Sequence, residues 1–256
     1  IIHQIRQMSG AHASRILAFN VDAGALHKCD AVTGTNKSDQ RRWSKVWFGF
    51  PHVGAGHKDE HRNVLANQLL ILRFLISVAP YLTEGPLPEA IQGRKRRAAS
   101  EDDEDDEEPI EAADDEPDVS ATSLPPRRQG SVLITIRNVV PYTLWNIPIL
   151  GKRLRDVLQP IAASAPSPPK GIRAPTVSDV DKNGAQYVLW RSFEFVPSNW
   201  PGYSHRRTVG FVEGLSTSHN EDLLRRPTQP PQQGQPSGRH VGTGECRTYE
   251  LALRPV

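Results

Sequence analysis

The sequence S-V-L-I-T-I at residues 131–136 decides the fold, because it is a nearly unbroken run of apolar and β-branched residues. A strand with one face in water alternates apolar and polar residues. A continuous apolar run is instead typical of a strand buried on both faces of a parallel sheet. Residues 131–136 are therefore predicted to form a central strand.

Strand-like and helix-like patterns alternate on both sides of this run. The predicted strands are residues 15–20, 46–50, 131–136, 187–196 and 246–253, and the predicted helices are residues 1–13, 59–82 and 141–154. Pro148 should kink the last of these helices or mark a break in it. This alternation predicts an α/β fold with a parallel sheet covered by helices. No helix separates the last two strands, so we expect them to pair antiparallel at one edge.

Three segments contain too few apolar residues to order themselves, and we expect them to be disordered insertions. They span about residues 84–129, 160–184 and 216–244. A shorter polar stretch at residues 30–41 is expected to be a loop. Apart from these segments, residues 1–254 are predicted to form a single domain.

The charge of the chain is divided unevenly along the sequence. The formal net charge is +2, but residues 101–118 contain 13 Asp and Glu and no Lys or Arg, so the remaining chain carries +15. A body this basic favours binding to a polyanion, because neutralising phosphates releases condensed counterions. The alternative, that the charge only keeps the protein soluble, stays open on this feature.

Cysteine usage and apolar patterning narrow the class of protein further. The two cysteines, Cys29 and Cys246, form no C-x-x-C pair, which indicates a reducing compartment and gives no structural zinc site. The longest apolar stretch, residues 69–82, is interrupted by Arg73 and Pro80. We therefore expect a buried helix there rather than a membrane anchor.

Chemically distinctive residues follow two of the predicted strands, at the edge where ligands bind in open α/β sheets. Asp22 follows the first strand and could accept a hydrogen bond from the amino group of an adenine ring; capping a helix or turn is the alternative. Phe50 and Pro51 close the second strand, where an aromatic ring can stack on a base. His52 could act as a proton acceptor near neutral pH, or as a structural hydrogen-bonding group.

The loop at residues 199–208 places aromatic side chains beside basic ones. Its stacking and hydrogen-bonding residues are Trp200, Tyr203, His205, Arg206 and Arg207. Aromatic rings interleaved with arginines suit single-stranded or flipped-out RNA. The alternative is a tight Pro-Gly turn with solvated charges.

Together these segments resemble the eukaryotic large-subunit (25S) ribosomal RNA uridine-N(3) methyltransferase family. The family is marked by V-D-A-x-x-L-H, F-N-F-P-H-x-G and P-G-Y-x-H-R-R-T segments, which match residues 21–27, 48–54 and 201–208 here. The resemblance implies a Rossmann-like class I methyltransferase sheet whose last strand is antiparallel. Family members also carry a glycine-rich loop after their first strand, which this sequence lacks, so we expect the sheet to be incomplete at the N-terminus. Gly49 replaces the family asparagine.

The resemblance also implies an enzyme that transfers a methyl group from S-adenosyl-L-methionine to N3 of uridine. The residues it implies are Asp22, Ala23, Phe50 and Pro51 for the cofactor, His52 for catalysis, and Trp200, Tyr203, His205, Arg206, Arg207 and Thr208 for RNA. No metal is implied.

The implied partner is ribosomal RNA in pre-ribosomal particles, and the implied location is the nucleus and nucleolus. The basic cluster at residues 94–97 resembles a nuclear-import signal. Two rival hypotheses stay open: a non-catalytic RNA-binding or ribosome-assembly module, and a methyltransferase that acts on another RNA. The sequence leaves the oligomeric state open.

Overall fold

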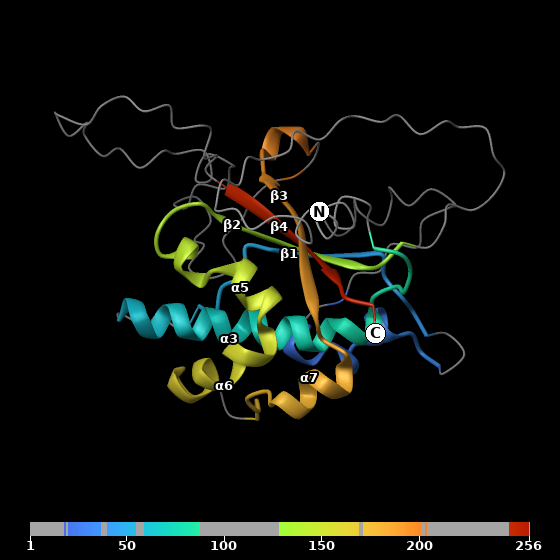
Figure 1. Ribbon diagram of the computed structural model, residues 1–256, viewed down its shortest axis with the longest axis horizontal. Helices are drawn as coiled ribbons and strands as arrows, with labels where there is room; N and C mark the ends of the chain where they lie inside the picture. Colours follow the sequence, from blue (N-terminus) through green and yellow to red (C-terminus); the bar gives the residue numbers. More distant parts are fainter. Residues whose placement is uncertain are drawn as a thin grey trace, which may run out of the picture.

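A mixed sheet of four strands organises the protein (Figure 1). The computed structural model describes residues 18, 20–36, 40–54, 59–87, 128–168, 171–200, 203 and 246–255. The strands are β1 Lys45–Gly49, β2 Ser131–Arg137, β3 Tyr187–Glu194 and β4 Cys246–Leu253, in the order β1-β2-β4-β3. β1 pairs parallel with β2, whereas β4 is antiparallel to both of its neighbours.

The strand predictions at residues 46–50, 131–136, 187–196 and 246–253 are confirmed, and so is the α/β class of a Rossmann-like methyltransferase sheet. The expected antiparallel pairing of the last two strands is also confirmed. The sheet is less parallel than predicted, because β4 inserts between β2 and β3 and leaves only one parallel pair in the described part. The predicted helix at residues 1–13, and all but two residues of the predicted strand at 15–20, lie outside the described residues.

Helix α3, Glu60–Val78, is the central helix of the core. It begins after Asp59, whose carboxylate accepts hydrogen bonds from the backbone N–H groups of the first turn, and it continues into the 3₁₀ helix η3, Ala79–Tyr81. Its apolar side chains, among them Ile71, Leu72 and Leu75, are fully buried. The segment Glu60–Tyr81 is apolar and long enough to cross a membrane by composition alone, but 61% of its most apolar window is buried in this protein, as in a core helix.

The helices labelled in Figure 1 lie on one side of the sheet. With α3 on this side are α5 Ile147–Lys152, α6 Leu154–Ser164 and α7 Val177–Asn183, together with the 3₁₀ helices η1 Ala23–Lys28 and η4 Tyr142–Trp145. Alternate β2 residues, Val132, Ile134 and Ile136, point into this layer and are almost completely buried. Among the described residues, the opposite face carries the short 3₁₀ helix η5, Pro197–Asn199, whose C-cap Trp200 stacks on Trp47. We call this face the open face.

The helix predicted at residues 141–154 is broken into three pieces. Asn146 adopts a left-handed backbone conformation, with φ at 49°, and ends η4 there. Its side chain then caps α5, and Pro148 lies in the first turn of α5, where a missing N–H group costs nothing. A second break at Arg153 separates α5 from α6. The break near Pro148 is thus as predicted, but a left-handed asparagine two residues earlier makes it.

Two segments expected to be irregular contain helices. The stretch at residues 160–184, expected to be a disordered insert, holds the end of α6 and all of α7. A capping box explains the order of α7, because Thr176 caps the N–H of Asp179 while the Asp179 carboxylate binds back to Thr176. The polar stretch at residues 30–41 contains the short helix α2, Asp30–Thr33. Residues 88–127 and 204–245, which hold most of the other two predicted inserts, lie outside the described residues.

Candidate functional site

The loop that follows β1 and the segment that follows β3 meet at the carboxyl end of the parallel pair. Phe50 extends the β1–β2 pairing by donating its N–H to the carbonyl of Thr135 at 2.8 Å, and its positive φ of 50° turns the chain away from the strand. Its ring lies 5.9 Å from Phe195, which in turn lies 5.3 Å from Tyr203. Phe50 and Tyr203, assigned from separate motifs, therefore belong to one cluster.

Two tryptophans complete this group, and we call Trp47, Phe50, Phe195, Trp200 and Tyr203 the aromatic cluster. The rings of Trp47 and Trp200 are nearly parallel, at an interplanar angle of 17° and a centroid distance of 6.3 Å. Both residues remain about half exposed, at 47% and 49%. Burial raises the pKa of Tyr203 to about 12, so its phenol is neutral at neutral pH. The cluster offers uncharged aromatic surface for stacking.

His52 follows Phe50 in the loop after β1, and one of its ring nitrogens is already occupied. Its Nδ1 accepts a 2.8 Å hydrogen bond from the backbone N–H of Gly54. The residue as a whole is exposed, yet burial of the imidazole lowers its pKa, so the ring is neutral near neutral pH. A neutral imidazole whose Nδ1 accepts must carry its proton on Nε2. Here His52 presents a hydrogen-bond donor, not a free acceptor.

Helix α3 holds this loop in place. The side-chain oxygen of Asn67, a residue only 1% exposed, accepts a 2.9 Å hydrogen bond from the backbone N–H of Val53. Asn67 is itself fixed by donating to the backbone of Asn63 at 2.9 Å. The ring of His52 lies 6.2 Å from Trp145, whose buried indole N–H has no hydrogen-bond partner among the described residues. The loop is thus anchored to α3 through Asn67, and the buried indole N–H of Trp145 lies near the ring of His52.

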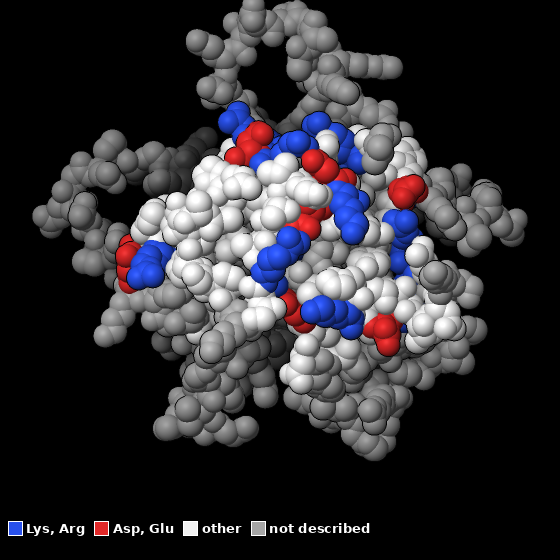
Figure 2. Space-filling model, turned by 90° about the horizontal axis from the view of Figure 1, so that it is seen from below, with Lys and Arg blue, Asp and Glu red and all other residues white. Residues whose placement is uncertain are grey.

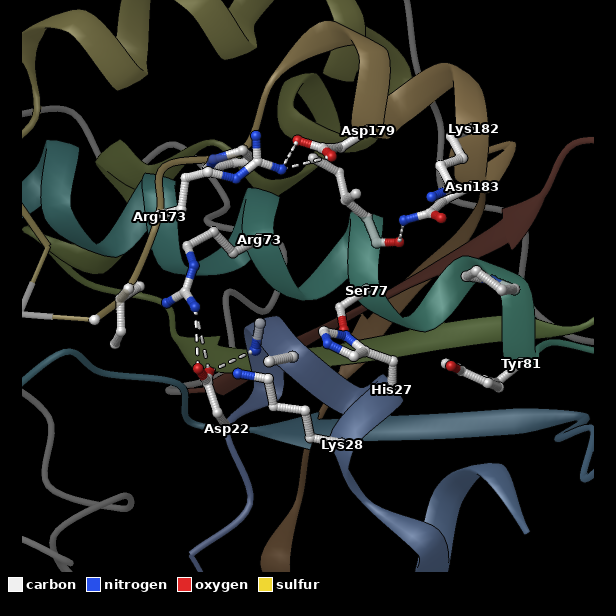
Figure 3. A pocket seen from close by; sticks show the side chains of 17 residues that line it. Asp22, His27, Lys28, Arg73, Ser77, Tyr81, Arg173, Asp179, Lys182 and Asn183 are labelled. Atoms are coloured by element: carbon white, nitrogen blue, oxygen red, sulfur yellow. Dashed lines mark hydrogen bonds and ion pairs between the residues drawn. The ribbon is translucent and has the colours of Figure 1, made fainter. Parts of the chain in front are cut away.

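Asp22 lies in a different environment. Its carboxylate caps η1 by accepting from the N–H of Gly24 at 2.8 Å, and it pairs with the guanidinium of Arg73 on α3 at 3.1 Å. Figure 3 shows these groups on the wall of a cavity of about 580 Å³ between η1, α3 and α7. His27, Lys28 and Lys182 also line this cavity, whereas no residue of the aromatic cluster does.

The residues expected to hold the cofactor are therefore not brought together. Val53 is anchored at Asn67 of α3 and Asp22 at Arg73, six residues further on. That separation is about 9 Å along the helix axis, and the two anchors lie on different sides of the helix. Ala23 packs against the core, and Phe50 belongs to the aromatic cluster. Of the expected cofactor residues, Asp22 lines the cavity in Figure 3, whereas Ala23, Phe50 and Pro51 do not.

Charges of both signs alternate on the helix side of the molecule (Figure 2). Several of them are paired there: Arg73 with Asp22, Arg155 with Asp181, and Arg173 with Asp179. This face is thus no single basic patch. The basic excess expected from the sequence is not concentrated on it.

The open face of the sheet carries a polar network that the sequence did not reveal. Its centre is Glu250, whose side chain is fully buried. The carboxylate accepts hydrogen bonds from Lys45 at 2.8 Å, Ser131 at 2.6 Å and Arg191 at 2.8 Å. Burial alone would raise the pKa of Glu250, but these three hydrogen bonds outweigh it and lower the pKa. Glu250 is therefore ionised and binds cations from β1 and β3.

His205, Arg206, Arg207 and Thr208 lie outside the described residues. In the part that the structure describes, no group of three or more His, Cys, Asp or Glu side chains is arranged to hold a metal ion.

Comparison with known proteins gives two matches. A family model described as rRNA (uridine-N3-)-methyltransferase BTM5-like matches residues 3–207. The chain is also 26% identical over 178 residues to the 25S rRNA (uridine(2634)-N(3))-methyltransferase of Saccharomyces cerevisiae (strain ATCC 204508 / S288c). That alignment covers 68% of this chain and 40% of the yeast protein, so the chain spans less than half the length of this relative. No solved structure matches the chain.

Proposed function

Because the chain belongs to the family of BTM5-like rRNA (uridine-N3-)-methyltransferases, we propose that it methylates N3 of uridine in large-subunit (25S) ribosomal RNA with S-adenosyl-L-methionine as methyl donor. The observation that carries this proposal is that Phe50 and Tyr203 both pack against Phe195, at the carboxyl ends of β1 and β3. Residues of two motifs, about 150 residues apart in the chain, form one surface there, which we propose as the pocket for the acceptor base.

The chemistry of uridine N3 suits an aromatic pocket. N3 lies on the pairing edge of the base, so the target uridine must be unpaired or extruded before it can react. An extruded base loses its stacking partners, and aromatic side chains replace them. The aromatic cluster supplies such surfaces, and its member Phe50 directly precedes the Pro51–His52 turn.

The imide proton must leave N3 before or during methyl transfer, and negative charge then spreads onto the two neighbouring carbonyl oxygens of uracil. His52 holds its proton on Nε2, so its geometry favours donation to one of these oxygens over removal of the N3 proton. The proton itself would leave to solvent. This role replaces the proton acceptor expected from the sequence with an electrostatic one.

Asp22 lines the cavity between η1, α3 and α7, whereas Phe50 belongs to the aromatic cluster, so we assign no step to the cofactor. Its use is inferred from membership of a methyltransferase family. Ribosomal RNA in pre-ribosomal particles, and a location in the nucleus and nucleolus, are proposed on the same ground.

A second candidate function is a non-catalytic RNA-binding or ribosome-assembly module. The pairing of Asp22 with Arg73 favours it, because this carboxylate is engaged by a cation and lines a cavity apart from the aromatic cluster. An aspartate held in this way serves the fold without any cofactor. Both candidates need the aromatic cluster to contact RNA. A methyltransferase that acts on another RNA would use the same cluster.

One pair of measurements separates these candidates. The chain is produced in a yeast strain that lacks the 25S rRNA (uridine(2634)-N(3))-methyltransferase, and 3-methyluridine in 25S rRNA is quantified by mass spectrometry of nucleosides. Calorimetry of the purified chain with S-adenosyl-L-methionine runs in parallel. The enzyme proposal expects restored 3-methyluridine and cofactor binding. RNA binding without either result supports the assembly module. Cofactor binding with methylation of a different RNA supports the third candidate.

A further inference from the structure

We propose that the open face of the sheet is a platform for single-stranded RNA, on which bases stack on Trp47 and Trp200 while Lys45 and Arg191 neutralise phosphates. This inference deepens the proposed function, since it names the path of the RNA strand that flanks the target base. It rests on that function only for the identity of the RNA. The contacts that carry it are independent of methyl transfer.

The alternation of β1 places the platform residues on one face. The ring of Phe48 packs against Phe74 of α3 at 4.4 Å, on the helix side. Lys45 and Trp47 alternate with Val46 and Phe48, so they point to the open face. Trp200, the residue that ends η5, stacks on one side of Trp47, and the side chains of Lys45 and Trp47 remain about half exposed. The open face therefore presents a cation and a large ring side by side along one strand.

Trp47 is held in a fixed orientation. Its indole N–H donates to Thr135 at 2.8 Å, and the Thr135 hydroxyl shares a further 2.8 Å hydrogen bond with Thr248 in the buried layer below. The ring also stacks on Trp200. A ring that is fixed before binding loses little conformational entropy when a base stacks on it. An exposed, immobilised ring of this kind is suited to stacking.

The cations of the platform are fixed in the same way. Lys45 and Arg191 lie 5.2 Å and 4.9 Å from the ring centre of Trp190, and Glu250 binds both of them from below. Their side chains keep exposed fractions of 50% and 47%. Two cations on one buried carboxylate leave a net positive charge at the surface. A polyanion complements this arrangement.

The mixture of rings and cations favours RNA over a protein partner. Protein interfaces are depleted of charged residues at their centre. Surfaces that bind single-stranded nucleic acid instead combine basic side chains with aromatic rings, because every base has a stackable face and every nucleotide a phosphate. Lys45 and Trp47 follow one another along the open-face side of β1, and Trp200 stacks on Trp47. β1 leads directly into the turn at Pro51–His52. The flanking strand would thus lead into the proposed acceptor pocket.

The test is binding of the whole chain to a short fluorescent uridine-rich RNA, measured by anisotropy, with the duplex of the same strand as comparison. Trp47→Ala is expected to raise Kd roughly tenfold for the single strand, the scale of one lost base stack, while Trp47→Phe stays within about threefold. Trp43→Ala is the matched control, because Trp43 is also exposed but donates to Val32, away from the platform. It should leave Kd unchanged.

A second variant tests the phosphate contact. Lys45→Gln keeps a hydrogen-bond donor for Glu250 but removes the charge, and it should reduce the slope of log Kd against log salt by about 0.7, the value for one phosphate of a single strand. Urea unfolding of each variant confirms that it folds.

The platform is overturned if Trp47→Ala binds RNA like Trp43→Ala. It is also overturned if Trp47→Ala abolishes self-association in sedimentation while RNA binding persists, because the open face would then bind a second copy. Neither measurement uses the cofactor. A chain that binds RNA through Trp47 yet restores no 3-methyluridine contradicts the proposed enzyme and leaves the platform standing.

Discussion

Lys45 on β1 and Glu250 on β4 are joined by a 2.8 Å hydrogen bond, although 205 positions separate them in the sequence and β2 lies between their strands. The same carboxylate accepts from Ser131 on β2 and Arg191 on β3. One buried side chain thus bonds to all three other strands of the sheet. The network fixes the relative positions of the strands that carry the aromatic cluster.

Removing the charge of Glu250 should destabilise the protein. Glu250→Gln keeps the shape of the side chain but leaves two cations facing a neutral group. Breaking a fully buried ion pair lowers the free energy of unfolding by about 3 kcal/mol, and the loss is smaller here because both cations are half exposed. Glu84→Gln is the matched control, since that side chain is 79% exposed and lies 3.6 Å from Arg42, a pair worth below about 1 kcal/mol. Urea unfolding measures both. Equal losses would show that the network adds nothing.

Stability should fall in acid, and Glu250 should account for part of the fall. The unfolded chain takes up a proton at this carboxyl near its ordinary pKa of 4.5, whereas the folded chain, in which the pKa is lowered, keeps it ionised to more acidic pH. The unfolded state then binds more protons below about pH 4.5, so the free energy of unfolding decreases there. Asp179 acts in the same direction. Glu250→Gln should flatten the pH dependence of chemical unfolding; an unchanged slope would refute this assignment.

Gly130 should tolerate no side chain. A Cβ there would lie 2.7 Å from the Cβ of Leu82 and 2.7 Å from the backbone nitrogen of Thr83, and neither atom is free to move. Gly130→Ala is therefore expected to cost about 2 kcal/mol in thermal or urea unfolding. In Gly24→Ala the nearest atoms belong to the Arg73 guanidinium, which can shift into the adjoining cavity. That variant should lose below about 1 kcal/mol, and a larger loss than at Gly130 would contradict the packing described.

The donor role of His52 predicts a specific pattern of activity. His52→Ala should lower kcat for methylation about 100-fold, the scale of one lost donor to a developing oxyanion, whereas His52→Gln keeps an N–H donor and should retain more activity. Burial lowers the pKa of His52 below 6.5, so the ring stays neutral above that pH. The pH profile of kcat should therefore be similar in wild type and His52→Gln. Loss of an acidic limb from the profile in His52→Gln would instead identify His52 as a base.

The sequence predicted what depends on neighbours along the chain. The apolar runs at residues 46–50 and 131–136 became β1 and β2, because a buried strand must be apolar whatever surrounds it. The rule that loops at the carboxyl ends of parallel strands converge is consistent with Phe50 and Tyr203, which both pack against Phe195, whereas Asp22 lies elsewhere, in the cavity beside α3. The confirmed features of the fold, the four strands and the antiparallel pairing of the last two, follow from local apolar patterns and from the order of the elements.

What the sequence did not predict depends on contacts between distant residues. α7 lies in a proline-rich stretch, and its order depends on the Thr176–Asp179 cap and on packing of Val180 into the core. Nothing local marks Glu250 as buried, since its partners come from three other strands. Trp47 looks like one more apolar residue of a buried run, yet its side chain points away from α3 and is 47% exposed.

The position of β4 has a consequence for synthesis. β4 is the last described strand to be made, yet it lies between β2 and β3, which share no direct hydrogen bonds. When synthesis has reached the end of β3, the edges of β2 and β3 that will pair with β4 are therefore still without their partner strand. Pairs such as Thr135 with Thr248, 113 positions apart, form only afterwards, and such long loop closures are slow. Until then the nascent chain exposes unpaired edges of the kind that recruit chaperones.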